Sequence, residues 1–118
     1  MSTRALIIGK DKNGLYHYGQ TKYDGMDNLE WLQKNMSDVN KVEDFLHYMT
    51  EGCEEGGEGH GISSLWYNNN EPYIEWYEDG YNCGIAKSKE VILEDVKNDY
   101  FDFPEYISYW DGIKWENI

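Results

Sequence analysis

Cations and long apolar runs are both scarce in this chain of 118 residues. It has 10 lysine and arginine residues against 23 aspartate and glutamate residues, which gives a formal net charge of −13 at pH 7. No segment approaches the roughly 18 consecutive apolar residues of a membrane-spanning helix. A strongly negative protein repels nucleic acid and anionic membranes. We therefore expect no direct binding to nucleic acid and no association with a membrane.

Cysteine is also scarce. The two cysteines, Cys53 and Cys83, form no C-x-x-C pair, and no apolar leader follows Met1. Such a pattern indicates neither a disulfide framework nor a secretory signal. We expect a cytoplasmic protein.

Motifs for metal and nucleotide chemistry are missing as well. The soft ligands that could gather around zinc are His47, Cys53, His60 and Cys83. Their spacings match no zinc-binding pair. The segment that starts at Asp11 resembles a calcium loop but has Tyr16 where the loop needs glycine. Because G-x-S-x-G, P-loop and HExxH motifs are absent too, the sequence predicts no metal, no cofactor and no enzyme activity.

Hairpin and helix signals alternate without the regular βαβ order of parallel folds. In order, they predict an N-terminal hairpin over 1–25, helices over 27–50, an acidic glycine-rich loop over 51–61, a three-stranded meander over 62–87, a helix over 88–99 and a C-terminal hairpin over 105–117. This order predicts one domain over 1–118 of the α+β class. We expect a mainly antiparallel sheet with about three helices on one face.

Capping and turn residues give the expected boundaries. The helix N-caps are predicted at Asp27 or Asn28, at Ser37-Asp38 and at Ser88. Asn13-Gly14 and Asp111-Gly112 are typical of tight hairpin turns. A two-residue turn at Asp111-Gly112 would pair Trp110 with Ile113 and Ser108 with Trp115.

The negative charge is concentrated in the second part of the chain. Residues 1–50 carry 6 basic and 7 acidic side chains, whereas residues 51–118 carry 4 basic and 16 acidic side chains. Carboxylates on a surface can stand in for phosphates, and interleaved aromatic rings can anchor a protein partner. The predicted partner-binding residues are Tyr73, Glu75, Tyr77, Glu78, Asp79, Glu94, Asp95 and Asp99.

An alternative ligand site can be assembled near the N-terminus. It would consist of Arg4, His17, Tyr23 and Asp24. Arginine would hold an anion, histidine would move a proton near neutral pH, and aspartate would orient the histidine. The competing interpretation is structural, with Asp24-Gly25 forming a turn and Arg4 pairing with a carboxylate beside the sheet.

Several short segments, most of them in the first half of the chain, form a recognisable set. They are Ser2-Thr3-Arg4, Leu6-Ile7-Ile8-Gly9, Asn13-Gly14, Tyr16-His17, Tyr23-Asp24-Gly25, Lys41-Val42 and Ile62-Ser63-Ser64-Leu65. In these segments the chain resembles a group of small uncharacterised phage and prophage proteins. Proteins of that group begin Met-Ser/Gly-Thr-Arg and carry a His-Trp-Asp-Gly-Tyr signature. In this chain Tyr23 stands in place of the tryptophan, and Met26 follows the glycine. The resemblance implies an origin in a mobile element and no known activity.

Three hypotheses follow for function. The first is an anti-defence inhibitor, of anti-CRISPR or anti-restriction type, that blocks the basic nucleic-acid-binding surface of a host effector. The second is an immunity protein that neutralises a basic toxin. The third is a small enzyme or ligand-binding protein that uses the corner of Arg4, His17 and Asp24. The sequence leaves the partner and the oligomeric state open.

Overall fold

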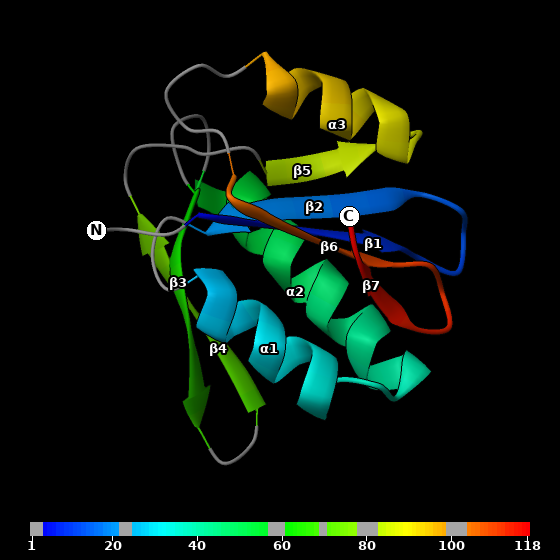
Figure 1. Ribbon diagram of the computed structural model, residues 1–118. Helices are drawn as coiled ribbons and strands as arrows, with labels where there is room; N and C mark the ends of the chain where they lie inside the picture. Colours follow the sequence, from blue (N-terminus) through cyan, green and yellow to red (C-terminus); the bar gives the residue numbers. More distant parts are fainter. Residues whose placement is uncertain (1–3, 22–24, 57–60, 69–70, 78–82, 99–103) are drawn as a thin grey trace.

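The computed structural model describes residues 4–21, 25–56, 61–68, 71–77, 83–98 and 104–118, and within 52–82 it describes the backbone alone. The elements in chain order are β1 (Ala5–Lys10), β2 (Tyr16–Thr21), α1 (Gly25–Asn35), α2 (Val39–Gly56), β3 (Gly61–Asn68), β4 (Glu71–Tyr77), β5 (Cys83–Ala86), α3 (Lys89–Lys97), β6 (Tyr106–Trp110) and β7 (Trp115–Asn117). Figure 1 shows one globule in which the helices flank a twisted sheet. The predicted α+β class is confirmed. None of the helices in the described ranges is long and apolar enough to cross a membrane.

The seven strands form one mixed sheet with β1 at its centre. The strand order is β4-β3-β2-β1-β6-β7, and β5 pairs with β2 off this path. β1 pairs antiparallel with β2 and parallel with β6. The pairs β3–β4, β2–β5 and β6–β7 are antiparallel, whereas among the described residues β2 and β3 pair in parallel at Thr21 and Ile62. The sheet is therefore mainly, but not entirely, antiparallel.

The strand β5 takes a different partner from the one that the meander predicts. It lies beside β2, where Tyr16 pairs with Ala86 and Gly19 pairs with Cys83. β3 and β4 pair with each other as a hairpin, and in the described part of the chain this hairpin pairs with β2 at Thr21 and Ile62. One edge of β2 is thus shared between β5 and β3.

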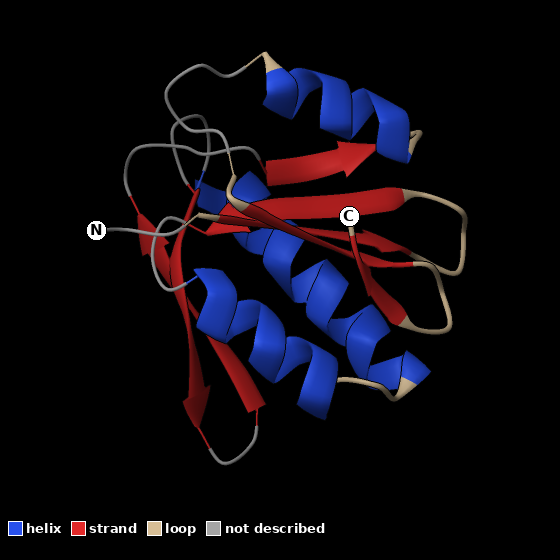
Figure 2. Ribbon diagram, viewed as in Figure 1, coloured by secondary structure: helices blue, strands red, loops and turns tan. Residues whose placement is uncertain are grey.

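Helices cover both faces of the sheet, which differs from the expected single face (Figure 2). Ala5 and Ile7 pack with residues of α1 and α2, whereas Leu6 and Ile8 pack with Ile92 and Val96 of α3. All four residues of β1 from Ala5 to Ile8 are fully buried. A central strand that is apolar at consecutive positions has to be covered on both sides.

The predicted helix starts are correct at two of three places. Asp38 caps α2 by accepting hydrogen bonds from the backbone N–H groups of Asn40 and Lys41. Ser88 caps α3 through Val91 N–H. α1 begins at Gly25, before the predicted caps, and Gly25 fits there because an added Cβ would lie 2.9 Å from Ala5. α2 continues to Gly56, into the segment predicted as a loop.

The C-terminal hairpin forms with a longer turn than predicted. Trp110 pairs with Trp115, and Ser108 pairs with Asn117, so residues 111–114 make a four-residue loop. The Asp111 carboxylate accepts hydrogen bonds from the N–H groups of Ile113 and Lys114. This side-chain cap closes the longer loop and shifts the register from the one that a two-residue turn would give.

Cys83 takes part in a disulfide, and the structure describes no free cysteine. The expectation of no disulfide is therefore wrong. Cys83 opens β5, and its Sγ lies 4.0 Å from the carbonyl oxygen of Met49 in α2. The position of this cysteine depends on the pairing of β5 with β2, which sequence spacing does not reveal.

Candidate functional site

The predicted partner-binding residues do not share one element. Glu94 and Asp95 are exposed on α3, whereas Tyr73, Glu75 and Tyr77 belong to β4, whose backbone alone is described. Glu78, Asp79 and Asp99 lie outside the described residues. Figure 1 shows α3 at the top of the molecule and β4 at the lower left, so these two elements are well separated.

The alternative corner is not assembled around Arg4 and His17. In the β1–β2 pair, Ala5 lies opposite Thr21 and Gly9 lies opposite His17. Arg4 therefore lies next to one end of β1 and His17 faces the other end, roughly 17 Å away along the strand. The backbone oxygen of Arg4 accepts hydrogen bonds from Glu105 and Tyr106. Tyr23 and Asp24 lie outside the described residues.

His17 instead belongs to a buried hydrogen-bonded group with Asp11 and Thr50. Its Nε2 lies 2.7 Å from Asp11 Oδ2, and its Nδ1 lies 2.9 Å from Thr50 Oγ1. The Thr50 hydroxyl lies 3.1 Å from the carbonyl oxygen of Leu46, one turn earlier in α2. Both ring nitrogens of His17 therefore have polar partners, and the ring ties the first hairpin to α2.

The Asp11 carboxylate is held by the turn that follows β1. Its Oδ1 accepts hydrogen bonds from the N–H groups of Asn13 at 2.8 Å and Leu15 at 2.9 Å. Burial alone would raise the pKa of Asp11, but the hydrogen bonds from His17, Leu15 and Asn13 outweigh burial and lower the pKa below its usual value. Asp11 is therefore a fixed, negatively charged group beneath the surface.

A second histidine lies against this group. The His47 ring packs edge-on to the His17 ring, with 4.7 Å between ring centroids. His47 Nε2 lies 3.2 Å from Glu43 Oε1, and the His47 side chain is 45% exposed. The group of Asp11, His17 and His47 thus extends from the interior to the surface of α2.

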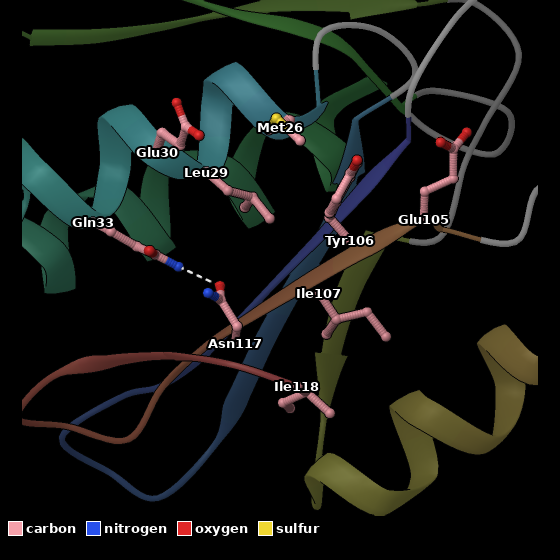
Figure 3. Close-up of a pocket in the computed structure, with 9 residues that line it drawn as sticks. All are labelled: Met26, Leu29, Glu30, Gln33, Glu105, Tyr106, Ile107, Asn117 and Ile118. Atoms are coloured by element: carbon pink, nitrogen blue, oxygen red, sulfur yellow. Dashed lines mark hydrogen bonds between the residues drawn. The ribbon is translucent and has the colours of Figure 1, made fainter.

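A separate cleft of about 290 Å³ lies between α1 and the strands β6 and β7 (Figure 3). One wall is formed by Met26, Leu29, Glu30 and Gln33 of α1. The other wall is formed by Glu105, Tyr106, Ile107, Asn117 and Ile118. At one end, Gln33 Nε2 donates hydrogen bonds to Asn117 Oδ1 and to Ser108 Oγ, which join α1 to the sheet.

The cleft combines an apolar lining with negative charge. The side chains of Met26 and Ile118 are 44% and 55% exposed. Glu30 and Glu105 are exposed on opposite walls (Figure 3). None of the ion pairs found within the described ranges involves either carboxylate. Such a lining suits a ligand that carries a cation beside an apolar group.

Sequence reasoning did not find the cleft or the partners of His17. Its predicted acidic residues include neither Glu30 nor Glu105, because α1 and the start of β6 meet only in the folded chain. Asp11 carried a local signal, since an aspartate before Asn13-Gly14 is typical of a turn. That signal predicts the turn but not the contact of Asp11 with His17.

Comparisons with known proteins give no relative. No protein-family model matches this chain, and no match was found to a curated protein or to a solved structure.

Proposed function

We propose that the protein acts by binding a partner protein with a basic surface. The partner class we favour is a nucleic-acid-binding effector of a host cell, of the CRISPR or restriction type, which the binding would inhibit. The net charge of −13 supports a cationic partner, because opposite charges speed association and suppress wrong partners. The resemblance of the first half to phage proteins supports the choice of a host defence effector.

The observation that carries this proposal is the acidic cleft between α1 and β6–β7. Glu30 and Glu105 line opposite walls of the cleft beside exposed apolar side chains, and none of the ion pairs found among the described residues involves either carboxylate. A lysine or arginine of the partner would pair with these carboxylates. An adjacent apolar side chain of the partner would then cover Met26 and Ile118.

The acidic residues of α3 have a different role in this proposal. Glu90, Glu94 and Asp95 are exposed on that helix, which lies on the other face of the sheet from α1 and α2. Charges outside a contact raise the rate of encounter more than they strengthen the complex. We therefore assign the contact to the cleft and long-range attraction to α3.

The proposed place of action is the cytoplasm of the host cell, where such effectors meet foreign nucleic acid. Disulfides are rare in that compartment. Whether binding depends on the Cys83 disulfide therefore tests the proposed location. Protein recovered from host cytoplasm after thiol blocking should still be competent to bind its partner. Binding that requires the oxidised form alone would argue for an oxidising compartment.

The test compares the native chain with two charge-reversed variants in a binding assay against purified basic effectors. The cleft variant is Glu30→Lys with Glu105→Lys, and the matched control is Asp44→Lys with Glu51→Lys on the exposed side of α2. Both pairs change the net charge equally. We expect the native chain and the control to displace nucleic acid from the effector, and the cleft variant to lose this competition.

Two outcomes would contradict the proposal. If both variants weaken binding equally, the net charge of the protein, and not the cleft, accounts for binding to the effector. If the native chain binds no nucleic-acid-binding effector at low salt but binds a basic toxin, the immunity function replaces the anti-defence function.

A further inference from the structure

A site of different chemistry lies where the β1–β2 turn meets α2. Asp11, His17 and His47 each offer one ligand atom, and these three atoms lie within 4.8 Å of one another. None of the three residues lines the acidic cleft. They come from the turn after β1, from β2 and from α2, so only the folded chain brings them together.

We propose that Asp11, His17 and His47 bind a divalent transition-metal ion, with Zn²⁺ as the best fit. Imidazole nitrogen and carboxylate oxygen are both zinc ligands, at bond lengths of about 2.0–2.2 Å. Tetrahedral coordination at those lengths separates the ligand atoms by roughly 3.4 Å. The longest separation allowed by the present arrangement, 4.8 Å, therefore has to shorten when the ion binds.

Two of the three ligands are already oriented. Asp11 Oδ1 is held by the N–H groups of Asn13 and Leu15, which leaves Oδ2 directed at His17. His17 Nδ1 is held by Thr50 Oγ1, which leaves Nε2 for the metal. A hydrogen-bond partner on the second ring nitrogen is the usual arrangement for a metal-bound histidine. The Thr50 contact supplies that arrangement before any metal arrives.

The metal would replace the proton between His17 and Asp11. His17 Nε2 and Asp11 Oδ2 are 2.7 Å apart and share one hydrogen bond. On binding, the proton between Nε2 and Oδ2 leaves to solvent, and the imidazole keeps one proton on Nδ1, which it donates to Thr50 Oγ1. The Nε2 lone pair and the carboxylate oxygen then both coordinate the ion. Two unlike ligand atoms in such close contact need only a small separation to accept a metal between them.

His47 is the ligand through which a metal ion in solvent would reach the site, and it is also the ligand whose position can adjust. Its side chain is 45% exposed and packs against the His17 ring. Rotation of this half-exposed ring closes the remaining distance, and Glu43 Oε1, 3.2 Å from His47 Nε2, orients the ring in the absence of metal. With three protein ligands, the fourth position falls to a water molecule.

The experiment measures Zn²⁺ binding to the untagged full chain by titration calorimetry and Co²⁺ binding by its visible absorption. The test variant is His47→Gln, because that side chain is half-exposed and its replacement leaves the buried Asp11–His17 pair intact. The matched control is Asp44→Asn, an exposed residue of the same helix. Circular dichroism checks that both variants are folded.

We expect one Zn²⁺ per native chain and per Asp44→Asn chain, and an affinity at least about tenfold lower in His47→Gln. Co²⁺ should give the intense visible bands of a tetrahedral site in the native chain, and these bands should be lost in His47→Gln. The proposal is overturned if the native chain binds no Zn²⁺, or if His47→Gln binds as tightly as Asp44→Asn.

Discussion

His17 Nε2 lies 2.7 Å from Asp11 Oδ2, and both side chains are only 1% exposed. Removing one member of a buried pair leaves the other without compensation. We expect Asp11→Ala to lower the free energy of unfolding by about 3–5 kcal/mol. Urea denaturation followed by circular dichroism measures this loss.

The Asp11→Asn variant separates the charge from the turn geometry. An asparagine oxygen can still accept the hydrogen bonds from Asn13 and Leu15. Asp11→Asn should therefore lose clearly less stability than Asp11→Ala. Equal losses in the two variants would mean that the contact with His17, and not the turn, accounts for the whole effect.

Gly9 is required by the close approach of α2 to the centre of the sheet. A Cβ added at Gly9 would lie 2.4 Å from Cδ2 and 2.6 Å from Cδ1 of Leu46, and Leu46 is fully buried. Overpacking of a core typically costs about 1–3 kcal/mol. We expect Gly9→Ala to destabilise the protein by that amount in thermal or urea unfolding.

Leu46 provides the control for this prediction. In a Leu46→Ala background the atoms that meet the new Cβ are absent, so adding Gly9→Ala should cost much less than it does in the native chain. A double-mutant cycle measures this difference. If Gly9→Ala costs the same in both backgrounds, backbone conformation and not the Leu46 contact restricts the position.

Asp111 should make the C-terminal hairpin sensitive to acid. Hydrogen bonds from the N–H groups of Lys114 and Ile113 lower the pKa of Asp111 below 3.8. A lowered pKa in the folded state stabilises the fold above pH 3.8, and this contribution is lost as the pH falls through the folded-state pKa. We expect Asp111→Ala to cost about 0.5–2 kcal/mol near neutral pH, as loss of a helix cap does.

The comparison with Asp111→Asn tests the origin of that effect. Asparagine keeps an acceptor for the turn but does not titrate, so this variant should retain most of the stability and lose the acid dependence of this position. Stability curves from neutral to acidic pH, measured for all three chains, show the difference. A variant with unchanged acid dependence would rule out Asp111 as its source.

Tyr109 should titrate only at strongly basic pH. Burial is the largest of the causes that raise the pKa of Tyr109 to about 12. The other causes are a hydrogen bond and an electrostatic interaction with Tyr16 and the charges of Asp111 and Glu116. A raised pKa means that the fold keeps the proton that the unfolded chain loses, so stability should fall between pH 10 and 12. The tyrosinate absorption of the native chain minus that of Tyr109→Phe should titrate near 12. A difference spectrum that titrates near 10 would contradict this prediction.

Local signals in the sequence predicted the local parts of the fold. The cap at Ser88 and the turn at Asn13-Gly14 depend on residues within a few positions of each other, and both form as expected. The pairing of β5 with β2 and the cover of α3 on the second face were not predicted. These depend on which strand a distant segment meets, and short-range patterns carry no information on that choice.

In the candidate sites, too, the sequence indicated single residues but not the contacts between distant segments. His17 was singled out because of its residue type, but its polar partners are Asp11 at the start of a turn and Thr50 in α2. The 33 residues between His17 and Thr50 include the end of β2, all of α1 and most of α2. Glu30 and Glu105 line opposite walls of one cleft for the same reason, because α1 packs against the sheet that contains β6.

The parallel pairing of β1 with β6 joins the two ends of the chain at the centre of the sheet, with Ala5 beside Tyr106 and Gly9 beside Trp110. During synthesis, β1 must therefore wait for a strand made about 100 residues later, and until then one of its backbone edges lacks its native partner. Such distant pairings slow folding and leave apolar strands open to aggregation. A truncation before Tyr106 should consequently yield an insoluble product, even though every helix would still be encoded.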